Sequence, residues 1–365
     1  MNKYKVCVYA ISKNEEKFVD RWVDSMKEAD YIVVLDTGST DNTVKKLKKH
    51  KVKVKSKIFD DFRFDIARNE SLKLIPKDTD ICVCIDLDEV FENGWRKKLE
   101  SVWDKDVSRV RYKYTWSFNE DGTEGVVFMA DKIHRFGQFK WTHPVHEILT
   151  SITNNNYKIV DEPKIWLKHY PDKTKSRGSY LRLLELSVKE DPEDDRNMHY
   201  LGREYMFYGM YDKCIETLTQ HLSMKTATWK DERAASMRYI ARCYIQKGNI
   251  QLAKNWLYSA IVEAPHLREA YIELATVLYN EENWYGTIYF INEALKITNR
   301  LNSYITDPKA WGSYPYDILS IAYYNLGKYD EAYTYTKIAT EHSPNDIRIK
   351  NNLKYIEEKM KKEKN

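Results

Sequence analysis

The chain contains Ile81-Cys-Val-Cys-Ile-Asp-Leu-Asp-Glu89, a short apolar run that breaks into acidic residues. This pattern is typical of a buried strand of an α/β sheet with carboxylates at its carboxyl end, where open α/β sheets bind ligands. A second apolar run, Tyr31-Ile-Val-Val-Leu-Asp36, also ends in a carboxylate. Two acids one residue apart suit a hard cation such as Mg²⁺ or Mn²⁺ bridged to phosphates. The two strand ends therefore predict a site for a nucleotide and a metal ion.

Around these runs, the N-terminal part alternates strand-like and helical segments. Such alternation predicts a Rossmann-like α/β domain with a mostly parallel sheet. Later segments are richer in aromatic residues and turns, which predicts mixed or antiparallel additions to that sheet. The predicted strands cover residues 6–11, 32–35, 52–59 and 81–85, the predicted helices cover 15–28, 42–49 and 63–74, and the additions cover 107–118, 125–136 and 158–169.

Beyond a polar stretch at residues 171–178, the sequence becomes helical and repetitive. Small residues recur in pairs twelve positions apart, with an apolar residue before each first member. The register resembles the tetratricopeptide pattern, in which small residues let paired helices approach. The four pairs are Gly202 and Cys214, Ala241 and Ala253, Ala275 and Thr287, and Ser320 and Ala332. We expect a catalytic domain at 1–172, a linker with a connecting helix at 173–192, and an all-α repeat domain at 193–365.

Bulk composition narrows the function classes. A chain of 365 residues with 42% hydrophobic content is long enough for two domains, and a net charge of +4 does not indicate a strongly electrostatic nucleic-acid binder. The lysine-rich stretch at 45–57 is interpreted as a solvated helix face and an edge strand, with a weak anion-attracting surface as the alternative. Five cysteines without metal or disulfide spacing favour a reducing, cytoplasmic location. No apolar stretch approaches the roughly 18 residues needed to span a bilayer.

Five short motifs occur in order in the N-terminal half. Each motif alone is weak, but their joint order and spacing are specific. They are Ser12-Lys-Asn-Glu-Glu16, Asp36-Thr-Gly-Ser-Thr-Asp41, Ala67-Arg-Asn69, Asp86-Leu-Asp88 and Val145-His-Glu147. On these residues, the N-terminal half resembles family 2 glycosyltransferases with the GT-A fold. With repeats appended, the chain is similar to the peptide S-glycosyltransferases that act on bacteriocins such as sublancin, although related sugar-core transferases share the same front half.

The resemblance implies a sugar-nucleotide donor, most often a UDP-sugar. It places Asp36 at the uracil edge and Arg68 near the nucleotide, opposite Asp36. It also implies a loop along the base, formed by Ala10, Ile11 and Ser12.

The resemblance further implies a metal shell of Mg²⁺ or Mn²⁺. Asp88 is expected to ligate the ion, while Asp86, with Leu87 beside it, is expected at the ribose, a metal-bound water or the ion itself. His169 matches a histidine that often completes the shell. Three other histidines compete for that place: His134, His143 and His146. The structural alternatives are loop-capping roles for the two aspartates and a core position for His169.

General chemistry supports these roles. A divalent cation stabilises the charge that grows on a leaving diphosphate, and the attacking acceptor must lose a proton to a nearby carboxylate or imidazole. Glu147 and His146 are the first candidate bases, and Asp131 is the next candidate. The alternative for His146 and Glu147 is a structural pair near a turn. An inverting enzyme needs one base and no covalent sugar intermediate. The aromatic segment at 95–116 is interpreted as core, with a sugar platform as the alternative.

The sequence therefore predicts a metal-dependent, inverting glycosyltransferase that moves a hexose or N-acetylhexosamine from a UDP-sugar to a peptide or protein, on Cys or on Ser/Thr. The repeat stack would engage the acceptor or mediate self-association as a homodimer. One rival is the same fold acting on a glycan, a lipopolysaccharide or a modified nucleobase. Another is a nucleotidyltransferase, whose product would retain the nucleotide. A rival of a different class is a tetratricopeptide scaffold with an inactive transferase domain.

Overall fold

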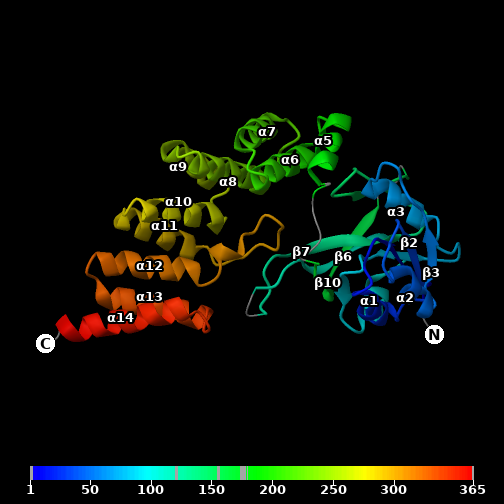
Figure 1. Ribbon diagram of the computed structural model, residues 1–365, viewed down its shortest axis with the longest axis horizontal. Coiled ribbons are helices and arrows are strands. Elements are labelled where there is room, and N and C mark those ends of the chain that lie inside the picture. Colours follow the sequence, from blue (N-terminus) through cyan, green and yellow to red (C-terminus); the bar gives the residue numbers. More distant parts are fainter. Residues whose placement is uncertain (1–2, 120–121, 154–156, 173–177, 179, 364–365) are drawn as a thin grey trace. The chain divides into compact units, whose positions relative to one another are not determined.

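The computed structural model describes residues 3–119, 122–153, 157–172, 178 and 180–363. The chain divides into two compact units, Met1–Ser187 and Val188–Asn365. The first is a mixed α/β unit and the second is entirely helical over its described residues (Figure 1). The predicted fold class, a mixed-sheet domain followed by a helical repeat domain, is confirmed.

An eight-stranded mixed sheet forms the centre of the first unit, in the order β3-β2-β1-β4-β7-β6-β10-β5. The first four of these strands are parallel, as the alternating sequence predicts, and β7 runs antiparallel to β4. The strands are β1 (Val6–Ser12), β2 (Tyr31–Asp36), β3 (Lys53–Ser56), β4 (Ile81–Cys84), β5 (Glu89–Phe91), β6 (Val107–Thr115), β7 (Val127–Arg135) and β10 (Lys158–His169). A separate ribbon pairs β8 (Phe139–Thr142) with β9 (Ile148–Ser151).

Alternate residues of the central strands enter two different cores. In β1, Val6, Val8 and Ala10 pack into one core, which also contains tryptophans 22, 95 and 103. Cys7 and Tyr9 pack into the other, with Cys82 and Cys84 of β4 and residues of the β8–β9 ribbon. Both faces of the parallel strands are thus covered, which explains why their sequences read as continuous apolar runs.

Four helices accompany the sheet: α1 (Val19–Met26), α2 (Thr43–Lys49), α3 (Phe64–Leu72) and α4 (Trp95–Val102). A further helix, α5 (Tyr180–Glu190), contains the boundary between the two units. Helix α1 begins at Val19 instead of the predicted residue 15. The reason is a set of contacts with the segment around the start of α2, because Asn14 adopts a positive φ of 55° and the backbone N–H groups of Glu15 and Glu16 donate to Thr43 and Asp41. Helix α4 and the short strands β5, β8 and β9 were not predicted.

The second unit is built from antiparallel helix pairs followed by one further helix (Figure 1). The pairs are α6 (Asp195–Phe207) with α7 (Tyr211–Ser223), α8 (Lys230–Gln246) with α9 (Ile250–Glu263), α10 (Arg268–Asn280) with α11 (Trp284–Lys296), and α12 (Tyr314–Asn325) with α13 (Tyr329–His342); α14 is Ile347–Glu363 and a 3₁₀ turn, η1, covers Pro308–Ala310. Each pair carries one of the predicted twelve-residue spacings.

The small residues of the repeats lie where helices touch. Cys214, Ala241, Ala253 and Ala332 are fully buried. A Cβ added to Gly202 would collide with the side chain of Leu218, so glycine lets α6 and α7 approach. This contact explains the small-residue spacing in the sequence.

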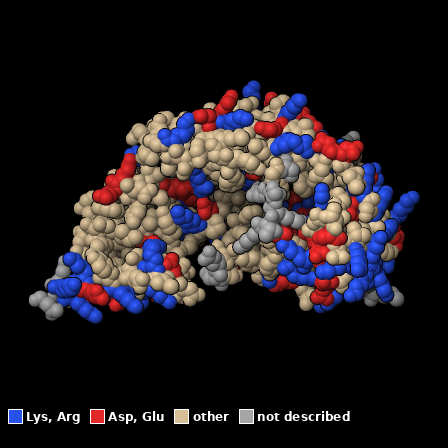
Figure 2. Space-filling model, viewed as in Figure 1, with Lys and Arg blue, Asp and Glu red and all other residues tan. Residues whose placement is uncertain are grey.

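The remaining bulk predictions concern surface and composition. All five cysteines are free and buried. Figure 2 shows lysine and arginine side chains gathered on the part of the first unit that carries α2 and β3, and the lysines of β3 are exposed. No helix among the described residues is both long and apolar enough to cross a membrane.

Candidate functional site

The parallel strands bring three of the predicted motifs to one edge of the sheet. Ser12 at the end of β1 is opposite Asp36 at the end of β2, and β4 pairs with the other side of β1 before the chain enters Asp86. Carboxyl ends of parallel strands are the ligand-binding edge of such sheets. The predicted loop along the base is corrected, because Ala10, Ile11 and Ser12 are the last residues of β1 and pair with β2.

Asp36 is buried and fully hydrogen-bonded within its own loop. Its Oδ1 accepts from the hydroxyls of Ser12 at 3.2 Å and Ser39 at 2.5 Å. Its Oδ2 accepts from the backbone N–H groups of Gly38 at 3.2 Å and Ser39 at 3.1 Å. The side chain therefore shapes the loop after β2, and a base edge that reached Asp36 would compete with these bonds.

The first two motifs hold each other in place. The Asn14 side-chain oxygen accepts from the Thr40 N–H at 2.7 Å, and the Asn14 N–H donates to Ser39 Oγ at 2.9 Å. The Asn42 N–H donates to Glu16 Oε2 at 2.7 Å, next to the start of α2. Residues 25 or 26 positions apart thus form one rigid wall beside the strand ends.

Asp86 lies in a cluster of opposite charges. Both of its oxygens contact the guanidinium of Arg68, at 2.9 and 3.0 Å, and Oδ2 also accepts from Lys132 Nζ at 3.2 Å. Arg68, on α3, is buried and also bonds Glu147. The predicted nucleotide-binding residue Arg68 and the predicted base Glu147 are thereby connected through the same side chain.

Burial and charge compete at this cluster. Burial opposes ionisation of Asp86, but the charges of Arg68 and Lys132 outweigh it and hold the pKa of Asp86 well below its usual range. Burial raises the pKa of Glu89, whose Oε2 accepts from the Asp86 N–H at 2.8 Å and whose Oε1 accepts from Tyr114 Oη at 2.7 Å. The cluster therefore keeps Asp86 ionised, whereas burial makes Glu89 harder to ionise than an exposed glutamate.

Asp88 and His169 form the pair best suited to a metal ion. His169 Nδ1 lies 2.9 Å from the Trp116 carbonyl, which can only accept, so this nitrogen carries a proton. Nε2 then faces Asp88 Oδ2 at 3.2 Å. Burial opposes protonation of His169, but its hydrogen bond with Asp88 raises its pKa above the usual value. A carboxylate beside an imidazole that is oriented through its other nitrogen fits a divalent cation.

Asp86 is not gathered with that pair into one three-residue set. Among the described residues, the donor atoms of Asp86, Asp88 and His169 do not all lie within 4.8 Å of one another. Leu87, between the two aspartates, is buried in the core beneath them. Asp88 and His169 are thus the candidate ligands, and Asp86 contacts Arg68 and Lys132.

The competing histidines lie in other surroundings. His134 is buried, with Nε2 2.8 Å from Tyr9 Oη and Nδ1 3.1 Å from the Arg135 carbonyl. His143 and His146 both adopt positive φ in the turn between β8 and β9, and the His146 ring meets the Tyr180 ring edge-on at 5.9 Å. Of the four histidines, His169 is the one that contacts Asp88.

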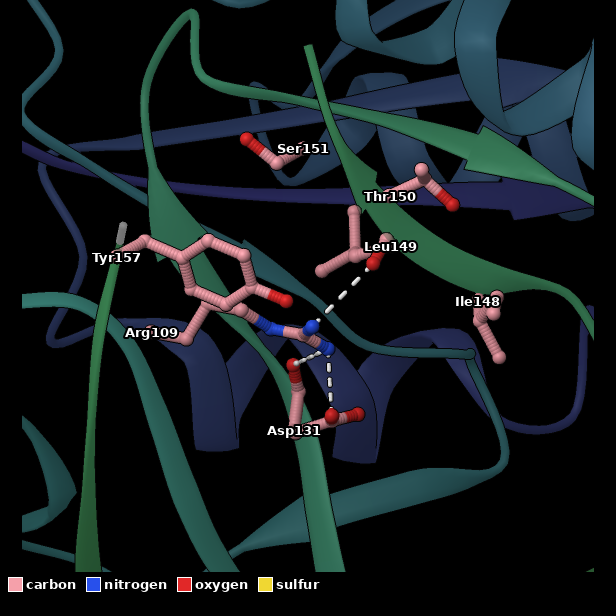
Figure 3. A pocket seen from close by; sticks show the side chains of 7 residues that line it. All are labelled: Arg109, Asp131, Ile148, Leu149, Thr150, Ser151 and Tyr157. Carbon is pink, nitrogen blue, oxygen red and sulfur yellow. Dashed lines mark hydrogen bonds and ion pairs between the residues drawn. The ribbon is translucent and has the colours of Figure 1, made fainter. Parts of the chain in front are cut away.

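The two carboxylates among the candidate bases, Glu147 and Asp131, lie in different places. Glu147 belongs to the Arg68 cluster. Asp131 lies in a pocket of about 470 Å³ with Tyr157 and the strand β9, and its Oδ2 accepts from Arg109 at 2.5 Å (Figure 3). The pairing of β6 with β7 has an irregularity at Asp131 and Lys132, and these neighbours serve separate clusters.

Sequence inspection did not single out Lys132, Tyr114 or the role of Trp116. No local pattern marks Lys132, because its partner Asp86 is 46 residues away. In the aromatic segment, Trp95 and Trp103 are buried as predicted, whereas Trp116 is 45% exposed and its ring stacks beside His169 at 6.1 Å. The segment therefore contributes both core and an exposed indole next to the candidate metal pair.

Comparisons with known proteins identify both units. Residues 7–160 match the model of glycosyl transferase family 2, and residues 269–362 match the model of the prolyl 4-hydroxylase peptide-substrate-binding domain, a tetratricopeptide-type module. The chain thus carries a glycosyl transferase family 2 domain and a helical domain of the tetratricopeptide type. No significant match was found among curated proteins.

Solved structures are similar to about half of the chain. The chain is 22% identical to a protein in a crystal structure of MamA protein, with a TM-score of 0.36. The match covers 46% of this chain and 83% of the MamA chain. The chain is 21% identical to a chain in a crystal structure of the APC/C hetero-tetramer Cut9-Hcn1, with a TM-score of 0.41. The match covers 50% of this chain and 33% of that chain. Likenesses at this level carry no functional inference.

Proposed function

We propose that this protein is a metal-dependent, inverting glycosyltransferase that moves a sugar from a UDP-sugar to a peptide or protein acceptor. One observation carries the proposal: Asp36 ends β2 and Asp86 follows β4, the two parallel strands on either side of β1, and Asp88 lies beside an oriented His169 at the same sheet edge. The match to glycosyl transferase family 2 covers the same residues except His169. Such sheet edges are where nucleotides bind.

The binding of the sugar-nucleotide donor is argued from the charges at the strand ends. A leaving UDP gains negative charge, which Mg²⁺ or Mn²⁺ held by Asp88 and His169 would stabilise. Asp86 stays ionised beside this pair because Arg68 and Lys132 surround it. The wall made by Asn14, Ser39 and Thr40 limits the nucleotide to one side of the strand ends.

On the acceptor side, the geometry favours Glu147 over Asp131 as the general base. Glu147 shares Arg68 with Asp86, whereas Asp131 is held by Arg109 in a separate pocket. A general base must reach the acceptor proton next to the anomeric carbon of the donor sugar. We therefore choose the candidate base that lies in the same cluster as Asp86. Trp116, exposed beside His169, would cover a sugar face.

The acceptor class rests on the repeat domain. Its residues 269–362 match the prolyl 4-hydroxylase peptide-substrate-binding domain, which supports a peptide as partner. Cysteine, serine or threonine would then be the acceptor residue, as in the bacteriocin S-glycosyltransferases that the sequence resembles. A homodimer is the alternative use of this domain.

The donor is tested by calorimetric titration of UDP-sugars with and without Mn²⁺. We expect binding by the wild type that requires the ion, and loss of that binding in Asp88→Asn. Asp161→Asn is the matched control, because Asp161 pairs with Arg111 on the exposed part of the same sheet. Metal-independent binding, or unchanged binding in Asp88→Asn, would contradict the assigned ligand. No UDP-sugar binding by the wild type would favour the scaffold with an inactive transferase domain.

The acceptor is tested by mass spectrometry of peptide libraries incubated with the protein and the preferred donor. A mass increase of one sugar on a peptide supports the proposal. Transfer only to glycans, lipopolysaccharide or modified nucleobases would replace the peptide with one of these acceptors. Incorporation of the nucleotide itself would identify a nucleotidyltransferase.

A further inference from the structure

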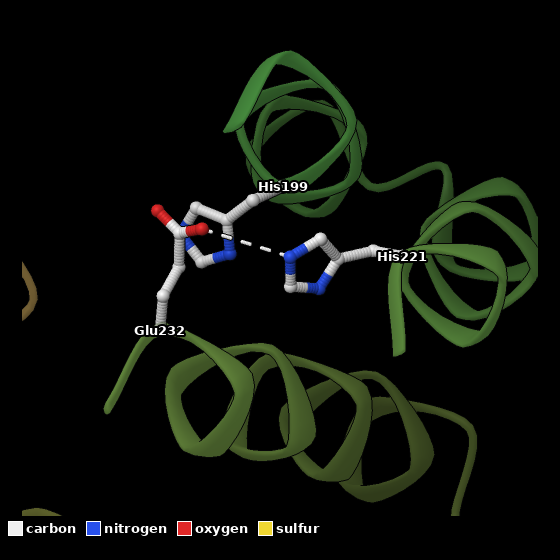
Figure 4. Close-up of side chains that lie close together, drawn as sticks. All are labelled: His199, His221 and Glu232. Atoms are coloured by element: carbon white, nitrogen blue, oxygen red, sulfur yellow. Dashed lines mark ion pairs between the residues drawn. The ribbon is translucent and has the colours of Figure 1, made fainter. Parts of the chain in front are cut away.

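Three buried side chains in the second unit bring metal-binding atoms together, far in sequence from the donor site. His199 on α6, His221 on α7 and Glu232 on α8 point toward one another (Figure 4). Both histidines are fully buried and Glu232 is 3% exposed. One donor atom from each lies within 4.8 Å of the others, and no other set of three or more His, Cys, Asp or Glu among the described residues meets this distance.

One ring nitrogen of each histidine lacks a hydrogen-bond partner among the described residues. Within the described part of the chain, neither His199 Nε2 nor His221 Nε2 has a hydrogen-bond partner, although both are buried. His221 Nε2 lies 3.6 Å from Glu232 Oε1, beyond hydrogen-bond distance. Buried polar atoms normally have partners, so two orphaned nitrogens in one cluster require an explanation.

The hydroxyl of Ser236 determines which ring nitrogens of the two histidines have a free lone pair. Ser236 Oγ lies 2.8 Å from His199 Nδ1 and 3.1 Å from His221 Nδ1. One hydroxyl donates only one proton, so at least one Nδ1 must itself be the donor. The opposite Nε2 of that neutral ring is then a bare lone pair inside the core. Neutral imidazole is the form that binds metals.

The other repeats show that a histidine is not needed for packing here. His221 follows the small residue Cys214 by seven positions, and the equivalent residues in the later repeats are Ala260, Ala294 and Ala339. All three alanines are fully buried. The first repeat therefore replaces a small apolar residue with an imidazole whose Nε2 lacks a hydrogen bond, at a cost that packing does not require.

The carboxylate is oriented like a metal ligand. Glu232 Oε2 accepts a hydrogen bond from Tyr304, and the Tyr304 ring stacks on Tyr200 at 5.6 Å. Tyr304 belongs to the long connection between α11 and α12, so this connection holds Glu232 with Oε1 toward His221. Outer partners that fix ligand orientation, here Ser236 and Tyr304, accompany most protein metal sites.

We propose that the first repeat binds a divalent transition-metal ion, Zn²⁺ in the first instance, through His199 Nε2, His221 Nε2 and Glu232. Two imidazoles and one carboxylate form a donor set that zinc accepts, with one further position for water. Donors of a tetrahedral zinc ion with bonds of about 2.0–2.1 Å lie roughly 3.3 Å apart, which is inside the 4.8 Å within which the donor atoms of these three side chains lie. The ion ties α6, α7 and α8 together. Arg196, which interacts electrostatically with Glu232, opposes a cation and sets a limit on affinity.

Zinc binding is measured on the full chain by equilibrium dialysis and elemental analysis after chelator treatment. The background is Asp88→Asn, which weakens the separate site of the first unit. We expect one tightly bound Zn²⁺ per chain in this background. Adding His221→Ala should weaken it by at least about 100-fold, since ligand loss exceeds the 10–100-fold typical of outer partners. His221→Ala introduces the residue that the other repeats carry, which favours folding. His266→Ala, at an exposed histidine paired with Asp231, is the matched control and should change nothing.

A second measurement does not depend on any cluster variant. Co²⁺ added to the Asp88→Asn chain should give the visible absorption of a tetrahedral site, and Zn²⁺ should displace it. Absence of tight Zn²⁺ binding in the Asp88→Asn background would overturn the proposal. So would unchanged zinc affinity in His221→Ala, or a cobalt spectrum without tetrahedral bands, and the three side chains would then be a buried polar core.

Discussion

The group of buried ionisable side chains around Arg68 in the first unit and the group around Glu232 in the second are satisfied differently. In the first unit, Arg68 and Lys132 contact Asp86, and Tyr114 donates to Glu89. In the second unit, His199 and His221 leave Nε2 atoms without hydrogen-bond partners among the described residues. The charged groups around Asp86 satisfy one another, whereas the two Nε2 atoms lack a cation or a hydrogen-bond donor. Internal compensation identifies a preorganised site, and its absence identifies a place for an additional ligand.

The largest effect is expected from Arg68→Ala. Removing one partner of a buried ion pair leaves uncompensated charge, so the first unit should lose about 3–5 kcal/mol of unfolding free energy. Hydrogen exchange in peptides of β1, β2 and β4 measures this unit separately from the repeats. Arg111→Ala, which breaks an exposed pair with Asp161, should cost at most about 1 kcal/mol. Equal losses in both variants would remove the distinction between the buried cluster and a surface pair.

Zinc should act on the other unit alone. At a free concentration near 100 times its Kd, Zn²⁺ should stabilise the repeats by about 2.7 kcal/mol in the Asp88→Asn background. Exchange protection in α6, α7 and α8 should rise, while that of the central sheet should not. Glu232→Gln should abolish the gain. Stabilisation of both units to the same extent would show that the ion acts nonspecifically.

Packing in the first repeat gives the next largest effect. Gly202→Ala inserts a methyl group against Leu218, so the repeats should lose about 1–3 kcal/mol. Leu218→Ala in the same chain opens space for that methyl group. The double variant should therefore be less destabilised than the sum of the single variants. Strict additivity in denaturant unfolding would contradict the proposed collision.

The last effect is a pH dependence, which is the smallest of the four when it is expressed per pH unit. Burial lowers the pKa of His134 to about 4, below its unfolded value near 6.5, so the unfolded chain binds more protons between these values. Stability of the first unit should therefore fall as pH drops through this window, by about 1.4 kcal/mol per pH unit from this residue.

His134→Asn tests this assignment because asparagine keeps a donor and an acceptor without titrating. The pH slope of the first unit should decrease in this variant. In chelator-treated protein, the slope of the repeats, to which His199 contributes, should stay the same. A first-unit slope that His134→Asn leaves unchanged would assign the acid sensitivity to other groups.

Much of the fold was predictable because its patterns are local. The apolar runs before Asp36 and Asp86 have the length and composition of buried strands, and the small residues at 202 and 214 mark one helix pair. Errors occurred where distant hydrogen bonds override propensity. Helix α1 starts late because Glu15 and Glu16 bond residues near the start of α2. Strands β8 and β9 are too short for a period to emerge from four residues.

The candidate site was predictable in part, and for the same reason. Asp36, Asp86 and Asp88 are recognisable from their motifs, and His169 from its place at the end of the last strand. Lys132 was not recognisable, since nothing near it in the chain indicates a carboxylate partner. The three-residue cluster of the repeats was equally hidden, because His199, His221 and Glu232 lie on three helices with no metal-binding spacing.

The sequence by itself determined the strand and helix order, the repeat register and the acids at the strand ends, because these depend on periodicity and on neighbours along the chain. Only the tertiary structure decided that Arg68 and Lys132 contact Asp86, that His169 faces Asp88, and that the Nε2 atoms of two imidazoles in the first repeat lack hydrogen-bond partners among the described residues. Those contacts depend on which distant side chains packing brings within a few ångströms, and local sequence patterns carry no information about that choice.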